Sequence, residues 1–314
     1  MFSPKRILIP VDFGASSRAA LAQARALAVG RPEVRLRVLH VYEPPYYAPE
    51  ALVSLPGQAP LPMIDYVRVQ AQRQLDEELA GWAADPELAG RFDARLVSGL
   101  AFEELPQEAA TWKADLIVMG THGRRGFAHL LLGSVAERVV RQAPCPVMVV
   151  RATGTTVTPP TAFERVLVPI DFGPDSAAAA RLGMALSKDG AGSVTLLHVV
   201  PTPAYAGEVL VPRAGGIRLG EFLHDEAQRR LEMFAQDVGH GGLDRCHFLV
   251  MQGSAAEQVV HLATEDNYGT IVMGTKGRHG LAHFFVGSVA ERVLRHAVCP
   301  VVITRAVFGD AAQS

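Results

Sequence analysis

The sequence predicts an α/β fold that is used twice in tandem, and three observations support this prediction. Short apolar runs alternate with alanine-rich stretches of helical length, which is the pattern of a mainly parallel sheet with helices on both faces. The chain has 314 residues, enough for two domains. Residues 116–152 align without a gap with residues 270–306, and 24 of these 37 positions are identical. A repeat at such a long period indicates duplication of a whole domain.

Each half is expected to contain five strands separated by four helices. In the first half the apolar runs that predict strands are 7–11, 36–41, 92–97, 115–120 and 146–150. The stretches that predict helices are 16–29, 66–83, 102–111 and 134–142.

Proline marks where the first strand of each half should end. Pro10 and Pro169 cannot donate to a strand ladder, so we expect them at the carboxyl ends of their strands, where a ligand could begin. The proline-rich segments 42–65 and 201–220 follow the second strand of each half. They predict long loops over the carboxyl edge of the sheet.

Composition narrows the class of protein. The net charge of −2 gives no basic footprint, which argues against a nucleic-acid partner. Three cysteines do not make a paired disulfide framework and favour a reducing, cytoplasmic setting. The start of the chain lacks the apolar region of a signal peptide, and no apolar run is long enough to predict a membrane span. The sequence shows neither the His/Cys spacing of a zinc site nor a Walker-type lysine loop.

One glycine pattern occurs twice, at 120–134 and 274–288. Each copy has a glycine, two residues, a second glycine, nine residues, and then Gly-Ser at the start of a predicted helix. Glycines between a strand and a helix let backbone N–H groups surround a phosphate. If the strand order is flavodoxin-like, the first and fourth strands flank the switch point, so Asp12 and Gly120 should meet across one crevice. Asp171 and Gly274 should meet in the same way.

These residues resemble the universal stress protein family. Members have a Val-Asp pair after the first strand and a Leu-His-Val second strand, and those that bind ATP have the glycine pattern above; both halves match. The resemblance covers residues 5–306 and implies two ATP-binding, Rossmann-like domains, at 1–152 and 163–308, joined by a linker at 153–162.

The resemblance also implies the binding residues, with ATP as the cofactor together with Mg²⁺. In the first half Asp12 and Val41 contact adenine or ribose, Pro10 and Val11 line that pocket, Gly120, Gly123, Gly133 and Ser134 hold phosphates, and Met119, His122 and Val135 lie beside them. The matching residues of the second half are Pro169, Ile170, Asp171, Val199, Met273, Gly274, Lys276, Gly277, Gly287, Ser288 and Val289. Arg124 and Arg278 add positive charge in the two glycine loops.

Several of these residues have simpler interpretations. Ser134 and Ser288 each begin a Ser-x-x-Glu sequence, which predicts a capping box. A simpler role for Asp12 and Asp171 is to start the turn that leads into the first helix of each half. His40 and His198 end apolar strands and are interpreted as structural histidines. The cations at 122, 124, 276 and 278 could simply belong to a solvated loop.

Three functions remain open at this point. The first is an ATP-binding stress-response module that reports nucleotide to an unidentified protein partner. The second is a slow ATPase, for which the sequence offers no assignable catalytic residue or metal site. The third is a nucleotide-free interaction scaffold. The last strands, at 146–150 and 300–304, are apolar edge strands that need a partner. The two halves could satisfy each other within one chain, or chains could pair further into a homodimer, which is the state we expect.

The two halves differ just before the second glycine pattern. Gly269 and Thr270 replace Asp115 and Leu116, and we expect this exchange to loosen the second site.

Overall fold

A computed structural model describes most of the chain. The described residues are 4–47, 49–54, 59–121, 132–152, 163–188, 192–201, 210–211, 217–238, 243–275 and 287–308. The chain divides into two compact units, one of which is Pro4–Ala152 while the other lies in the part that follows. The predicted linker, 153–162, lies outside the described residues.

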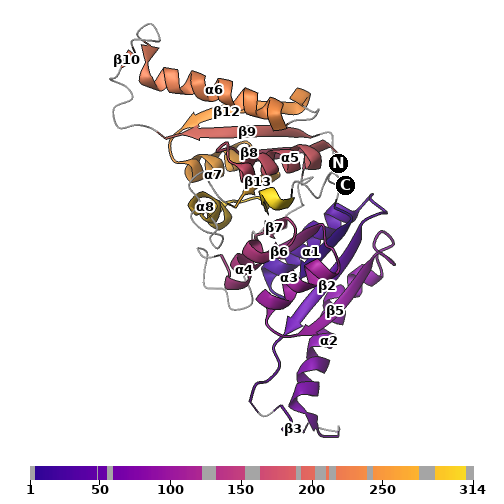
Figure 1. The fold of residues 1–314 in the computed structure, drawn as a ribbon. Coiled ribbons are helices and arrows are strands. Elements are labelled where there is room, and N and C mark those ends of the chain that lie inside the picture. Colours follow the sequence, from indigo (N-terminus) through magenta and orange to yellow (C-terminus); the bar gives the residue numbers. More distant parts are fainter. Residues whose placement is uncertain are drawn as a thin grey trace. The chain divides into compact units, whose positions relative to one another are not determined.

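The first unit is one five-stranded sheet with helices packed on it (Figure 1). Its elements are β1 (Arg6–Pro10), α1 (Ala15–Ala28), β2 (Arg35–Tyr42), β3 (Leu52–Val53), β4 (Leu61–Pro62), α2 (Met63–Ala83), β5 (Phe92–Ser98), α3 (Ala101–Thr111), β6 (Leu116–Gly120), α4 (Ser134–Gln142) and β7 (Val147–Val150). The strand order is β7-β6-β1-β2-β5, and every neighbouring pair is parallel. The right-handed crossovers of such a sheet put α1 and α2 on one face, and α3 and α4 on the other.

The second unit repeats this arrangement. Its elements are β8 (Arg165–Pro169), α5 (Pro174–Lys188), β9 (Ser193–Val200), β10 (Leu210–Val211), β11 (Ile217–Arg218), α6 (Leu219–Val238), β12 (Cys246–Gln252), α7 (Ala255–Glu265), β13 (Thr270–Gly274), α8 (Ser288–His296) and β14 (Val301–Thr304). The order β12-β9-β8-β13-β14 is again parallel throughout.

The predicted flavodoxin-like strand order is wrong. Counted along each half, the strands lie in the order 3-2-1-4-5, which is Rossmann-like, whereas a flavodoxin-like sheet has the order 2-1-3-4-5, with the third strand beside the first. It is the observed order that makes the first and fourth strands neighbours, and the crossovers change direction between them. This places the switch point between β1 and β6 in the first unit, and between β8 and β13 in the second.

The core of each unit lies on both faces of its central strands. In β1 the residues Ile7, Leu8 and Ile9 are fully buried, and four of the five residues of β6 are buried. A strand covered on both faces needs a continuous apolar run rather than an alternating one. The edge strand β5 is more exposed, with a burial pattern that contains no buried residue.

The proline-rich segments contain more structure than the expected loops. Leu52 pairs with Pro62, so that β3 and β4 form a short antiparallel ladder just before α2. The second unit has the matching pair β10 and β11. Pro10 and Pro169 are the last residues of β1 and β8, as expected.

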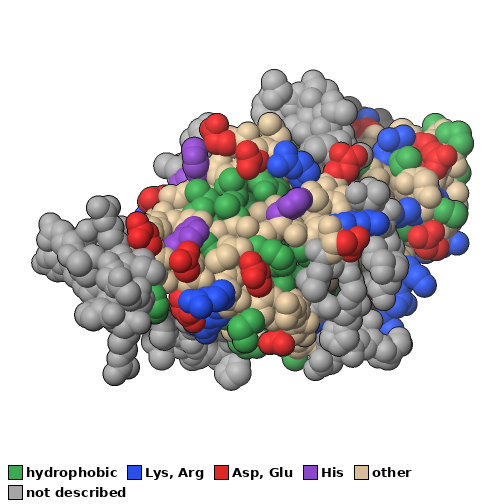
Figure 2. Space-filling model, turned by 90° about the horizontal axis from the view of Figure 1, so that it is seen from above, with side chains coloured by type: hydrophobic (Ala, Val, Ile, Leu, Met, Phe, Trp, Pro, Cys, Tyr) green, Lys and Arg blue, Asp and Glu red, His purple; other side chains and the backbone are tan. Residues whose placement is uncertain are grey.

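The surface mixes both signs of charge. Figure 2 shows Lys, Arg, Asp and Glu side chains interspersed on the face in view, with hydrophobic side chains between them. No helix in the described ranges is both long enough and apolar enough to cross a bilayer.

A glycine at the end of the fourth strand lets the first helix pack closely on it. A Cβ atom added to Gly120 would lie 2.6 Å from the carbonyl carbon of Ser16, in the first turn of α1. Added to Gly274, it would lie 2.6 Å from the Cβ of Asp175 in α5. Real Cβ atoms do not come so close, so any side chain here would push the helix off the strand.

We expect Gly120→Ala to lower the free energy of unfolding of the first unit by about 1–3 kcal/mol, because the added methyl overpacks this contact. Gly81→Ala is the matched control. Gly81 is in α2 with nothing within 4 Å of its added Cβ, so alanine should stabilise the unit by about 0.5–1 kcal/mol. Trp82 and Trp112 are the only tryptophans of the chain, so tryptophan fluorescence during urea unfolding reports this unit. Equal effects of the two substitutions would contradict the packing argument.

The cysteines are free thiols, and burial makes two of them weak acids. Burial raises the pKa of Cys299 to about 12, and burial together with Asp244 raises the pKa of Cys246 to about 11. Because the thiolate is the reactive form, both thiols should react slowly at neutral pH.

We therefore expect a disulfide reagent at pH 8 to label Cys246 in the native chain about 100-fold more slowly than in the urea-unfolded chain. Mass spectrometry of peptides from timed samples measures this rate for each cysteine. Native labelling of Cys246 or Cys299 at the unfolded rate would show that these thiols are activated rather than structural.

Candidate functional site

A cavity of about 410 Å³ lies at the carboxyl ends of β8 and β13, at the switch point of the second unit. Its volume is within the range of small-molecule sites. It brings together all nine described residues that were predicted for this half: Pro169, Ile170, Asp171, Val199, Met273, Gly274, Gly287, Ser288 and Val289. The predicted Lys276, Gly277 and Arg278 lie outside the described residues.

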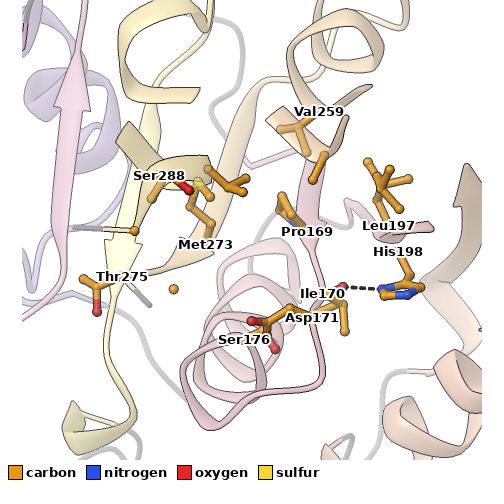
Figure 3. A pocket seen from close by; sticks show the side chains of 16 residues that line it. Pro169, Ile170, Asp171, Ser176, Leu197, His198, Val259, Met273, Thr275 and Ser288 are labelled. Carbon is orange, nitrogen blue, oxygen red and sulfur yellow. Dashed lines mark hydrogen bonds between the residues drawn. The ribbon is translucent and has the colours of Figure 1, made fainter. Parts of the chain in front are cut away.

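The two ends of the cavity differ in chemistry. Figure 3 shows Leu197 and Val259 at one end and the hydroxyl groups of Thr275 and Ser288 at the other, with Asp171 between them. An apolar end suits a flat aromatic ring, and a polar end beside a helix start suits an anion.

Asp171 is held in a tight turn by one of its two carboxylate oxygens. The N–H of Gly173 donates to Asp171 Oδ1 at 2.8 Å, and the hydroxyl of Ser176 donates to the carbonyl oxygen of Gly173 at 3.0 Å. Between them, Phe172 has a φ of 65°, a left-handed conformation that is uncommon for a bulky residue. The turn interpretation of this aspartate is thus correct for Oδ1.

The other oxygen of Asp171 is the exception. Oδ2 is buried and has no hydrogen-bond partner among the described residues, although the residue lines the cavity. A buried carboxylate oxygen without a donor costs free energy unless a ligand or water supplies one. The turn therefore fixes the carboxylate beside the cavity and leaves Oδ2 without a donor among the described residues.

The first unit has the same turn. The N–H of Gly14 donates to Asp12 Oδ1 at 3.0 Å, Ser17 donates to the carbonyl oxygen of Gly14 at 3.0 Å, and Phe13 also has a φ of 65°. Phe13 and Phe172 have the same left-handed backbone conformation, so this conformation is a feature of the repeated domain.

The other predicted residues of the first half lie at the same places in their unit. Pro10, Val11 and Asp12 end the first strand, Met119 and Gly120 end the fourth, Gly133, Ser134 and Val135 begin α4, and Val41 is in β2. The predicted His122, Gly123 and Arg124 lie outside the described residues.

The capping-box interpretation of the two serines is wrong. Ser134 is the first residue of α4 and not its N-cap, which is Gly133, and no side chain caps the helix. Glu137 instead pairs with Arg141 one turn later, at 3.9 Å. In α8 Gly287 is likewise the N-cap. The serine hydroxyls are thus not used as caps, and the first N–H groups of each helix have no intrahelical partner.

A backbone hydrogen bond closes the base of each glycine loop. The N–H of Gly133 donates to the carbonyl oxygen of Thr121 at 2.8 Å, and that of Gly287 donates to Thr275 at 2.6 Å. The end of the fourth strand and the start of the next helix are therefore fixed against each other, at the polar end of the cavity.

The histidines that end the second strands have the expected structural role. The Nδ1 atom of His198 is 2.7 Å from the carbonyl oxygen of Ile170, and His40 makes the same contact with Val11. Since a carbonyl only accepts, Nδ1 donates. Each ring also packs against the left-handed phenylalanine of its unit, at 4.4 Å for Phe13 and 4.5 Å for Phe172.

Sequence reasoning missed some residues that line the cavity: Ser176, Leu197, His198, Ala255, Val259, Thr275 and Ala290. Alignment of the repeats could have found Ser176 and Thr275, because Ser17 and Thr121 stand at the matching positions. Ala255 and Val259 come from α7, which has no motif that points to a site.

The expectation that an altered strand loosens the second site is not supported. Gly269 and Thr270 stand at the amino end of β13, at the opposite edge of the sheet from the cavity. In the first unit Asp115 accepts from the N–H groups of Lys5 and Arg6 at this edge; in the second, the hydroxyl of Tyr268 donates to Thr195 at 2.7 Å. Each unit therefore has its own hydrogen bond at this edge, made by Asp115 in the first unit and by Tyr268 in the second.

In the described part of the chain, no group of three or more His, Cys, Asp or Glu side chains is arranged to hold a metal ion.

Comparison with known proteins agrees with this geometry. The model of the universal stress protein family matches residues 4–151 and again 162–305. A universal stress protein of Thermus aquaticus is 39% identical over 150 residues, which are 47% of this chain and 98% of that protein. One from Methanocaldococcus jannaschii is 30% identical over 144 residues, 46% of this chain and 82% of that protein.

The solved structure of a universal stress protein from Archaeoglobus fulgidus shows the same fold over nearly the whole length. It covers 97% of this chain and 100% of its own, with a TM-score of 0.66 at 22% identity. Because the family model matches both halves, this chain belongs to the universal stress protein family and contains two such domains in tandem.

Proposed function

We propose that this universal stress protein binds ATP in each half, at the switch point of the sheet, and serves as a nucleotide-dependent module of a stress response. The observation that supports this most directly is Asp171, which lines a cavity of about 410 Å³ and whose buried Oδ2 has no hydrogen-bond donor among the described residues. A ribose hydroxyl is a donor of the right kind, and it belongs to a ligand with an apolar ring at one end and phosphates at the other.

The rest of the cavity fits such a ligand. The apolar end, with Leu197 and Val259, would take the adenine ring. The polar end joins Gly274, Ser288 and the start of α8, where unpaired N–H groups and the helix dipole favour phosphate. Among the described residues, no group of three or more His, Cys, Asp or Glu side chains is arranged to hold a cation. Mg²⁺ would therefore be held mainly by phosphate oxygens and water, which is how it usually binds with nucleotides.

Hydrolysis of ATP is the alternative, and the described lining residues give it little support. Among them only Asp171 and His198 are titratable. Asp171 already uses Oδ1 in its turn, and His198 uses Nδ1 to hold Ile170. Fast hydrolysis needs a positioned water and charge stabilisation at the γ-phosphate, so we propose that any turnover is slow. The homodimer and the protein partner expected from the sequence stay predictions.

Replacing Asp171 by asparagine should weaken ATP binding to the second site about 10- to 100-fold, because a charged acceptor that meets a ribose hydroxyl becomes an amide. Asp12→Asn should act in the same way on the first site. Isothermal titration calorimetry of the full chain with ATP and Mg²⁺ measures both.

Asp237→Asn is the matched control for this prediction. It makes the same chemical change at an exposed position near the carboxyl end of α6. ATP binding at both sites should therefore be unchanged. If all three variants bind ATP as the unmodified chain does, the aspartates do not hold the nucleotide.

Native mass spectrometry of freshly purified chain should show up to two bound ATP molecules, and the bound ADP should grow only over hours. Growth of ADP within seconds would favour the ATPase. Absence of bound nucleotide, together with no change of melting temperature on addition of ATP and Mg²⁺, would favour the nucleotide-free scaffold.

A further inference from the structure

Besides the exchange of His122 for Lys276 in the glycine loops, the two halves differ in one charged residue directly behind the cavity wall of the second unit. Ser16 in α1 and Asp175 in α5 stand at the same position of the repeat, since a Cβ added to Gly120 meets Ser16 as one added to Gly274 meets Asp175. The second half thus has a carboxylate where the first has a hydroxyl group.

Asp175 is fixed at the polar end of the second cavity. Its Oδ2 accepts from the hydroxyl of Thr275 at 2.7 Å, and its Oδ1 accepts from the N–H of Ala306 at 2.9 Å. Three cavity-lining residues surround it: Gly274 packs on its Cβ, Thr275 donates to it, and Ser176 follows it in the chain. These two hydrogen bonds fix the carboxylate directly behind the cavity wall.

A fixed negative charge here must act on phosphates. Two like charges a few ångströms apart repel each other even in water, and more strongly where protein excludes solvent. The repulsion grows with each negative charge that the ligand adds, and salt or a bound cation reduces it.

We propose that Asp175 is a specificity-determining residue that makes the second site favour nucleotides with fewer phosphate charges, whereas the first site, with Ser16, favours ATP. This inference rests on the proposed nucleotide binding. It assigns the two halves different ligands within one class: adenine nucleotides that differ in phosphate number. One chain would then respond to the ratio of ATP to AMP rather than to ATP alone.

The test compares stepwise binding of AMP, ADP and ATP to the full chain by native mass spectrometry or calorimetry, with EDTA present. In the unmodified chain we expect the ratio of the first to the second association constant to be about tenfold larger for ATP than for AMP, since ATP brings two more charges near the carboxylate. Added Mg²⁺ should reduce this difference, because the cation neutralises part of the phosphate charge.

Three variants separate the charge from a structural role. Asp175→Ser should lower the ratio for ATP to nearly the ratio for AMP, and Asp175→Asn should do nearly the same while keeping an acceptor for Thr275 or Ala306. Both variants keep Lys276, so the exchange of His122 for Lys276 does not account for a change in the ratio. Ser16→Asp should weaken the binding of ATP to the first site more than the binding of AMP.

The outcomes distinguish this inference from the proposed function. If Asp175→Asn changes the binding of AMP, ADP and ATP by the same factor, Asp175 only holds the loop and the specificity proposal is overturned. Equal phosphate dependence of both sites in the unmodified chain would overturn it too, with nucleotide binding intact. If neither site binds any nucleotide, the proposed function itself fails.

Discussion

The close packing of the first helix against the end of the fourth strand is the contact on which the candidate site depends. It requires glycine at position 120 in one unit and at position 274 in the other, because any Cβ there would collide with the first turn of α1 or α5. The first and fourth strands are parallel neighbours beneath this helix, so their carboxyl ends share one crevice. The glycine that the sequence suggests as a phosphate-binding residue is therefore needed in the first place for the packing of the helix on the strand.

The Asp-Phe-Gly turn then gives the crevice its polarity. Its left-handed phenylalanine is a conformation that costs free energy, and it recurs with the same φ in both units. The turn places the phenylalanine ring against a histidine that itself holds the first strand's end, and it fixes the aspartate through a single oxygen. A rigid carboxylate with a spare buried oxygen is a pre-organised acceptor, which lowers the cost of ordering when a ligand donates to it.

Duplication lets one scaffold vary its two sites separately. The exchanges at the amino edge of the sheet, such as Asp115 for Gly269, alter how a strand begins and lie at the opposite edge from the cavity. The exchange of Ser16 for Asp175 is on the opposite edge and adds charge to the cavity wall. Position along the strand decides whether a difference between the halves concerns stability or binding, since ligands meet only the carboxyl ends.

The sequence by itself determined the fold class, the tandem repeat and the position of nearly every strand and helix. These follow from local periodicity, and the observed α4 (Ser134–Gln142) has the expected bounds. Strand ends, helix starts and the family resemblance also indicated nine of the residues that line the cavity of the second unit, but not the other seven. Only the tertiary structure decided the 3-2-1-4-5 strand order, the role of Ser134 as first helical residue rather than cap, and the contribution of α7 to the cavity. Likewise, Asp175 accepts a hydrogen bond from Thr275, which is 100 residues away in the chain. Such contacts depend on how elements pack, which no local pattern of residues encodes.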